Sequence, residues 1–243
     1  MKVVAIIQAR MGSTRLPGKV LRELAGKTML YRVVNRTRRV KLLDQVVVAA
    51  PEAEANNVLA DACKEMGVAC FRGDEDDVLD RYYRAALAFG AEVVVRITSD
   101  CPLIEPEIIE RVVGGLLDHY EELDYVCSFI PRRTFPIGLD VEAMKFAVLE
   151  QAWREDNNPA WREHVTEYVL HHPELFRMQG VTNDTDLSRM RWTVDTIEDF
   201  QFVQKIYDHF GGDDFTWQQV LRLLDQHPEW LAINRHIQQK VVA

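Results

Sequence analysis

Short apolar runs alternate with stretches of helical periodicity over the first 120 residues, and this alternation constrains the fold more than any other feature of the chain. The runs are continuous, which is typical of strands buried on both faces, and they lie at 3–8, 45–50, 68–71 and 92–97. Helical stretches follow them at 30–40, 53–66, 76–89 and 106–120. This order predicts an α/β fold, in which right-handed crossovers build a mainly parallel twisted sheet with helices on both faces.

Beyond residue 120 the pattern becomes irregular. We expect strands at 124–129, 138–142, 176–181 and 191–194, and helices at 145–155, 161–171, 197–210 and 217–226. The sequence has no internal repeat, low-complexity tract or linker. We therefore expect one domain over residues 1–243, with an embedded subdomain at about 130–190 and a C-terminal helical segment at about 213–243.

The charge of the chain is unevenly distributed. The 243 residues have a formal net charge of −9, yet the first 41 carry eleven Lys or Arg and a single acid, Glu23. An acidic protein repels a nucleic-acid backbone, but its basic end can still hold one small polyanion. Within this end, four basic residues are expected on the solvated face of a helix, namely Arg36, Arg38, Arg39 and Lys41.

The sequence also bears on location and on the state of the cysteines. No apolar run approaches the roughly 20 residues of a membrane helix, and the N-terminus lacks the features of a signal peptide. We therefore expect a cytoplasmic protein with no membrane partner. The four cysteines form no CxxC pair, so we expect reduced thiols rather than a zinc site or disulfides.

The segment from Gln8 to Lys19 has the character of a phosphate-binding loop. It follows a buried strand, and ligands of open α/β sheets bind at the carboxyl ends of strands. Glycines allow backbone N–H groups to approach an anion, hydroxyls add donors, and arginine or lysine supplies charge; these residues are Gly12, Gly18, Ser13, Thr14, Arg10, Arg15 and Lys19. A helix start directly behind the loop would add its positive end. The pattern is neither GxxxxGK[ST] nor GxGxxG, which disfavours a P-loop NTPase and a dinucleotide site.

Residues 8–19, QARMGSTRLPGK, resemble the N-terminal signature of the cytidylyltransferases that activate acidic sugars, and most closely the subgroup of spore coat polysaccharide biosynthesis protein F. Three further segments resemble the same subgroup: FRGDEDDVLDR at 71–81, RITSDCPL at 96–103 and RWTVDTIED at 191–199. The resemblance implies a nucleotidyltransferase (Rossmann-like, GT-A-like) fold. It also implies a CTP-dependent enzyme of surface polysaccharide biosynthesis, and a homodimer.

Two aspartates stand at predicted strand ends. Asp100 follows the strand at 92–97, and Asp195 follows the one at 191–194. Carboxylates that arrive from two strand ends can share Mg²⁺, which accepts few protein carboxylates together with water and phosphate oxygens. In the family, aspartates at matching positions bind this metal. The residues alone leave an alternative, in which Asp195 caps the helix that begins near 197.

The resemblance also implies which residues bind the nucleotide. It implies that CTP is bound by residues of the loop and by Arg81, namely Gln8, Ala9, Arg10, Gly12, Ser13, Arg15, Lys19 and Arg81. Arg81 would lie near the cytosine and ribose; the alternative for this residue is an ion pair with Asp77 one helical turn away.

The acceptor side is predicted from charges in the irregular half. Asp140 and Glu142 alternate with apolar residues and could face a sugar, and Arg132 and Arg133 could clamp its carboxylate. Glu163 and His164 open a predicted helix, where His164 could accept the proton of an attacking hydroxyl. The alternatives are solvated loop charges for the arginines and a structural role for the histidine.

The sequence thus predicts transfer of CMP from CTP to an acidic sugar with release of pyrophosphate. Its catalytic residues would be Arg10, Lys19, Asp100 and Asp195. Two other readings stay open: a nucleotidyltransferase with another nucleotide or acceptor, and a non-catalytic nucleotide- or sugar-binding subunit.

Overall fold

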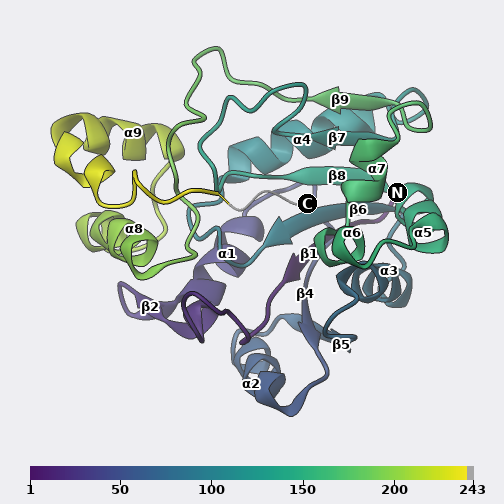
Figure 1. Ribbon diagram of the computed structural model, residues 1–243, viewed down its shortest axis with the longest axis horizontal. Coiled ribbons are helices and arrows are strands. Elements are labelled where there is room, and N and C mark those ends of the chain that lie inside the picture. Colours follow the sequence, from purple (N-terminus) through teal and green to yellow (C-terminus); the bar gives the residue numbers. More distant parts are fainter. Residues whose placement is uncertain (240–243) are drawn as a thin grey trace.

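Strand β1 (Val3–Gln8) is an inner strand of a seven-stranded sheet in the computed structural model, which describes residues 1–239 (Figure 1). The strand order is β5-β4-β1-β6-β8-β7-β9. β1 pairs in parallel with β4 (Gln45–Pro51) and β6 (Val93–Thr98), and β5 (Ala69–Gly73) continues the parallel half. β8 (Glu142–Lys145) runs antiparallel to β6. The last two strands are β7 (Tyr125–Cys127) and β9 (Met178–Gly180). The predicted mainly parallel α/β fold is confirmed.

Alternate residues of β1 face two different apolar cores, which is why helices cover both faces. Val3, Ala5 and Ile7 belong to one core, and Val4 and Ile6 belong to the other. Helices α1 (Met29–Thr37), α2 (Asn57–Glu65), α4 (Pro106–Asp118), α8 (Ile197–Phe210) and α9 (Trp217–Gln226) pack into the first core. Helices α3 (Val78–Ala88), α5 (Phe146–Glu155) and α7 (Glu167–His171) pack into the second. Helix α6 (Pro159–His164) lies next to α7.

The second half of the chain departs from the expected elements. The strand predicted at 138–142 begins at Glu142, and 191–194 forms only a single bridge between Ile137 and Arg191. Gly138 has a φ of +107°, and a Cβ there would lie 2.5 Å from the backbone nitrogen of Thr193. The two segments therefore meet by close backbone contact, which only glycine permits, and not by a regular ladder.

The helix predicted at 161–171 is two helices. Val165 has a φ of +69° and separates α6 from α7, and the N–H of Thr166 donates to the carbonyl of His164 at 2.8 Å. Glu163 and His164 consequently end a helix rather than open one. Residues 130–190 supply β8 and β9 to the main sheet and α5–α7 to one of its faces; their treatment as an embedded subdomain stays a prediction.

The loop after β1 does not run directly into a helix. A 3₁₀ turn at Lys19–Leu21 and a hairpin of β2 (Glu23–Leu24) and β3 (Lys27–Thr28) separate it from α1. The expectation that a helix N-terminus stands directly behind this loop is therefore wrong. Gly26 in the turn of the hairpin has a φ of +76°, a left-handed conformation that favours glycine.

The expectation for the basic residues of α1 is wrong at one position. Arg38, Arg39 and Lys41 are exposed, but Arg36 is fully buried. Its guanidinium pairs with Glu105 at 3.0 Å and lies 4.5 Å from the ring centre of Phe215. Such a charge is tolerated in a core because an acid and carbonyl groups surround it.

The C-terminal segment is helical only in part, and its residues 233–239 form turns and irregular structure. α9 is followed by a 3₁₀ turn at Pro228–Ala232, and residues 240–243 of the predicted segment lie outside the described residues. α8 and α9 lie together at one side of the sheet (Figure 1).

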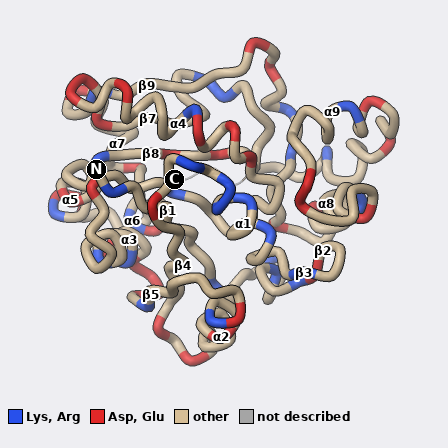
Figure 2. The backbone as a smooth tube through the Cα atoms, turned by 180° about the vertical axis from the view of Figure 1, so that it is seen from behind, with Lys and Arg blue, Asp and Glu red and all other residues tan. Residues whose placement is uncertain are grey.

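Acidic residues are spread over the periphery of the fold, among them those of α2, α5 and α8 (Figure 2).

Two further expectations concern membranes and cysteines. Within the described range, no helix has the length and apolarity that crossing a membrane requires. The four cysteines are free thiols, as expected, and Cys63, Cys101 and Cys127 are buried.

Removal of the buried Arg36 charge tests this packing. We expect Arg36→Met to lower the free energy of unfolding by about 3–5 kcal/mol, because Glu105 is left buried without its partner. Lys41→Met, at an exposed position, is the control and should change it by about 0.5 kcal/mol at most. Urea denaturation measures both variants, and equal effects would contradict the account.

Candidate active site

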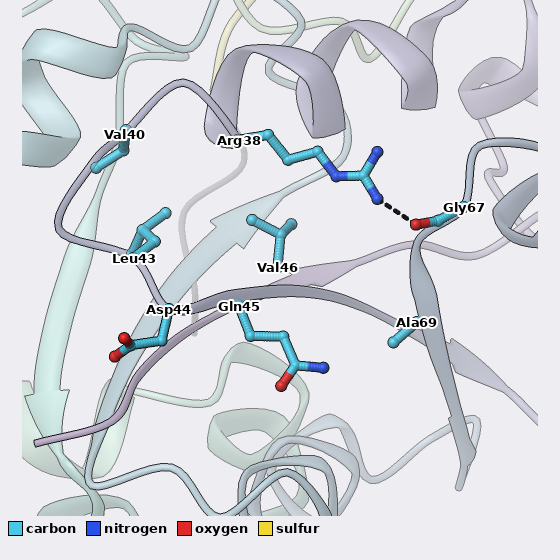
Figure 3. Close-up of a pocket in the computed structure, with 8 residues that line it drawn as sticks. All are labelled: Arg38, Val40, Leu43, Asp44, Gln45, Val46, Gly67 and Ala69. Carbon is cyan, nitrogen blue, oxygen red and sulfur yellow. Dashed lines mark hydrogen bonds between the residues drawn. The ribbon is translucent and has the colours of Figure 1, made fainter.

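A cleft of about 590 Å³ opens at the carboxyl ends of β1 and β6. Its walls come from the loop after β1, the start of α3, residues 98–101, residues 133–142, α6, α7 and the segment around Asp195. This is the edge at which open α/β sheets bind ligands. A second cavity of about 320 Å³ lies at the amino ends of β4 and β5, where Arg38 donates to the carbonyl of Gly67 (Figure 3). No predicted site residue lines this second cavity.

Nearly all predicted site residues line the cleft. They are the eight predicted nucleotide-binding residues, both aspartates and four of the acceptor residues: Gln8, Ala9, Arg10, Gly12, Ser13, Arg15, Lys19, Arg81, Asp100, Asp195, Arg133, Asp140, Glu142 and His164. Arg132 is exposed and does not line it, so only the second arginine of the predicted clamp is in place.

Lys19 joins the two aspartates. Its ammonium nitrogen donates to Asp100 Oδ2 at 3.1 Å, to Asp195 Oδ1 at 2.9 Å and to the carbonyl of Val194 at 2.8 Å. Burial opposes the charge of Lys19, but the two carboxylates outweigh burial and raise its pKa. Burial likewise opposes the charge of Asp100, whose pKa is nevertheless lowered by Lys19 and by hydrogen bonds. Lys19 and Asp100 are therefore both charged near neutral pH.

The alternative role for Asp195 is excluded by the structure. The cap of α8 is Thr196, whose hydroxyl accepts from the N–H of Asp199 in a capping box. Asp195 thus keeps both carboxylate oxygens for side chains, and Oδ2 receives Arg15 at 3.0 Å and Arg191 at 2.8 Å.

The loop that carries Lys19 is fixed by local contacts. Gly18 adopts a φ of +66°, which a residue with a side chain rarely does, and its N–H donates to the carbonyl of Met11. The N–H of Met11 donates in turn to Asn56 Oδ1 at 2.8 Å, and Leu16 is buried in the core. The turn at Gly18 therefore directs Lys19 inwards, towards the aspartates.

Three buried polar atoms of the cleft lack a hydrogen-bond partner among the described residues. They are Gln8 Oε1, Arg81 Nε and Arg96 Nε. An unpaired buried polar group costs about 1–3 kcal/mol, so these atoms are suited to hydrogen bonds with a bound polar molecule. Arg81 does not pair with Asp77, because its guanidinium donates to the carbonyls of Asp74 and Glu75.

Arg96 is a cleft residue that the sequence reasoning missed. It lies in β6 directly opposite Glu142 of β8, and the two side chains form an ion pair. Tyr125 donates to the other oxygen of Glu142 at 2.7 Å. Both carboxylate oxygens of Glu142 are therefore bound by protein side chains. The prediction that Glu142 could face a sugar needs a carboxylate that is free to do so. The signal that could have identified Arg96 is its charge, which stands inside the otherwise apolar run at 92–97.

The remaining acceptor-side residues gather near the mouth of the cleft. Arg133 pairs with Asp140, and burial raises the pKa of that carboxyl. His164 lies at the end of α6, and its neighbour Glu163 pairs with Arg10 at 3.1 Å across the mouth. The pair of Arg10 and Glu163 connects the loop after β1 with α6.

A magnesium ion held by Asp100 and Asp195 stays a prediction from the chemistry of the two side chains. Asp100 and Asp195 each place a carboxylate oxygen within 3.1 Å of the Lys19 nitrogen, so both oxygens converge on one point, which the ammonium group occupies. No group of three or more His, Cys, Asp or Glu suited to a metal occurs among the described residues. Two carboxylates suit Mg²⁺, which takes its other ligands from water and phosphate.

Comparison with known proteins agrees with this geometry. A family model described as cytidylyltransferase matches residues 4–221. Spore coat polysaccharide biosynthesis protein SpsF of Bacillus subtilis is 32% identical over 93% of this chain and 95% of its own length. A 3-deoxy-manno-octulosonate cytidylyltransferase of Geobacter sulfurreducens is 38% identical over 49% of this chain and 47% of its own.

A solved structure extends the similarity over the whole fold. A cytidylyltransferase from Leptospira borgpetersenii has a TM-score of 0.91 and 32% identity, and the match covers 99% of this chain and 100% of the other. The nucleotidyltransferase fold and the resemblance seen in the four sequence motifs are thereby confirmed. The chain belongs to the cytidylyltransferase family and is an enzyme of that class.

Proposed function

We propose that this enzyme transfers CMP from CTP to the anomeric hydroxyl of an acidic sugar and releases pyrophosphate. The observation that carries the proposal is the contact of Lys19 with both Asp100 and Asp195, inside a cleft lined by every predicted nucleotide-binding residue. Phosphoryl transfer of this kind needs aligned groups and compensated charge rather than covalent help from the protein.

The triphosphate is assigned to the loop after β1. Arg10, Arg15 and Lys19 line the cleft and supply three cations, and Gly12 leaves the backbone accessible. Arginine can grip phosphate through two N–H groups, and the lysine acts as a point charge. These residues bind the leaving pyrophosphate and orient the α-phosphorus towards the acceptor.

Asp100 and Asp195 are the residues that would hold Mg²⁺. When bound, the ion supplies charge to the phosphate oxygens and lowers the pKa of a coordinated hydroxyl. The two carboxylates themselves raise the pKa of Lys19 against the effect of burial, and so keep its ammonium group charged.

The acceptor is assigned to the opposite wall. Arg133 and Arg96 line it and offer guanidinium groups, which suit a sugar carboxylate. His164 lies on the same wall and could take the proton of the attacking hydroxyl. An acidic acceptor agrees with the relative named as a 3-deoxy-manno-octulosonate cytidylyltransferase.

The setting of the reaction follows from the relatives. A relative named for spore coat polysaccharide biosynthesis supports a role in the formation of a surface polysaccharide, in the cytoplasm where CTP is made. We further propose that the enzyme is a homodimer. Light scattering after gel filtration would then report twice the chain mass of 28.1 kDa, and a mass of one chain would refute the dimer.

The choice of nucleotide can be tested by thermal unfolding. With Mg²⁺ present, CTP at one hundred times its dissociation constant should stabilise the protein by about 2.7 kcal/mol. UTP, GTP and ATP at the same concentration should give smaller shifts. A larger shift with one of these three would assign another nucleotide to the cleft.

The transfer itself can be tested by pyrophosphate release. A panel of acidic sugars, with neutral sugars as the control, is incubated with CTP and Mg²⁺. Release of pyrophosphate with at least one acidic sugar and with no neutral sugar is expected. Nucleotide binding without release from any member of the panel would indicate a binding subunit instead of a transferase.

Lys19→Ala tests the assignment of the loop. We expect turnover to fall at least ~10²-fold, since one preorganised charge contact is lost. Lys41→Ala, at an exposed position outside the cleft, removes the same charge and should retain full turnover. If turnover with CTP survives Lys19→Ala nearly unchanged, the loop does not bind the triphosphate as proposed.

A further inference from the structure

Three cationic side chains contact Asp195, two of which line the cleft and one of which does not. Lys19 contacts Oδ1, whereas Arg15 and Arg191 contact Oδ2 at 3.0 and 2.8 Å. Lys19 and Arg15 line the cleft, and the proposed function assigns both to the triphosphate. Whenever these two turn to phosphate oxygens, Asp195 loses two of its partners.

Arg191 differs because it does not line the cleft and is only 5% exposed. Its guanidinium is anchored from behind by Asp199, with Nε to Oδ1 at 2.9 Å and Nη2 to Oδ2 at 3.0 Å. A fork bound at two points keeps its direction, which a flexible lysine does not. Arg191 is therefore placed to hold Asp195 without contacting the substrate.

Asp199 fixes the backbone of the same segment. It is fully buried, and its Oδ2 accepts the N–H groups of Asp195 and Thr196 at 3.0 and 3.1 Å. Both the side chain and the backbone of Asp195 are thus tied, through Arg191 and Asp199, to the first turn of α8.

The C-terminal segment completes this arrangement. Asn234 donates to Asp199 Oδ1 and to the carbonyl of Arg191, both at 2.9 Å. Gln239 accepts a hydrogen bond from Arg191 and itself lines the cleft. The residues after α9 consequently belong to the support of the site, although they are far from the other site residues in sequence.

We propose that Arg191 is a positioning residue, which keeps Asp195 aimed into the cleft while Lys19 and Arg15 bind the nucleotide. The proposal rests on the proposed function of Asp195. It assigns no contact with CTP to Arg191 itself.

A double-mutant cycle tests the proposal. Arg191→Ala should lower kcat about 10–100-fold, the usual effect of removing a partner that orients a ligand residue. CTP affinity without Mg²⁺, measured by calorimetry, should change less than threefold. In the Asp195→Asn background, Arg191→Ala should cause no further loss of kcat, because its effect passes through Asp195.

The outcomes separate the two proposals. An equal loss of kcat from Arg191→Ala in both backgrounds would overturn the positioning role, and so would a kcat at the level of the unchanged enzyme. Full turnover of Asp195→Asn alone would overturn the proposed function, and the positioning role with it.

A conservative variant and a matched control guard against simple misfolding. Arg191→Lys keeps the charge but not the fork, so kcat should be about tenfold lower in a folded protein. Arg32→Lys is the control, since Arg32 is 4% exposed, pairs with Asp213 at 3.1 Å and does not line the cleft. It should lower the melting temperature by a similar amount while kcat stays unchanged. Equal effects of the two lysine variants on kcat would refute the positioning role.

Discussion

The contact of one buried ammonium with two carboxylates is the interaction on which the site depends. Lys19 is 8% exposed, and a charge in that position is stable only beside partners of opposite charge. Asp100 and Asp195 provide them from two separate segments of the chain. The ion triad therefore joins three segments at the carboxyl edge of the sheet, and it keeps two carboxylates together that would otherwise repel each other.

Further buried charges join the helices on one face of the sheet, outside the cleft. Arg32 and Arg36 of α1 bind Asp213 and Glu105, so that α1, the start of α4 and the segment between α8 and α9 are held together. Tyr207 of α8 donates to the carbonyl of Pro102, close to the end of β6. The helices that contain these residues face one core, and none of the four charged residues lines the cleft.

Much of this could be predicted from the sequence, for a physical reason. A strand buried on both faces, such as β1 or β6, has a nearly continuous apolar sequence. Its carboxyl end lies on the ligand side of a parallel sheet. Gly18 and the cations of the loop after β1 follow such a run directly. The position of Asp100 beside this loop was accordingly accessible from strand ends. That of Asp195 depended on the family resemblance, since the residues alone also allowed a capping role and 191–194 forms only a single bridge.

The parts that could not be predicted depend on contacts distant in sequence. Arg36 is a charged residue in a basic stretch, and nothing local shows that Glu105, 69 residues away, meets it. Arg96 and Arg191 stood inside recognised motifs, but Glu142 lies 46 residues from Arg96, and Gln239, which accepts from Arg191, lies 48 residues from it. Backbone approaches such as that of Gly138 to Thr193 likewise replace ladders that period-two patterns suggest.

Calorimetric titration with CTP, in the presence and absence of Mg²⁺, measures the central claim most directly when the enzyme is compared with the double variant Asp100→Asn/Asp195→Asn. The account predicts that Mg²⁺ strengthens CTP binding to the enzyme and that this gain disappears in the variant, while binding without Mg²⁺ is retained. An undiminished gain in the variant would show that the two aspartates do not form the metal-binding centre of this cleft.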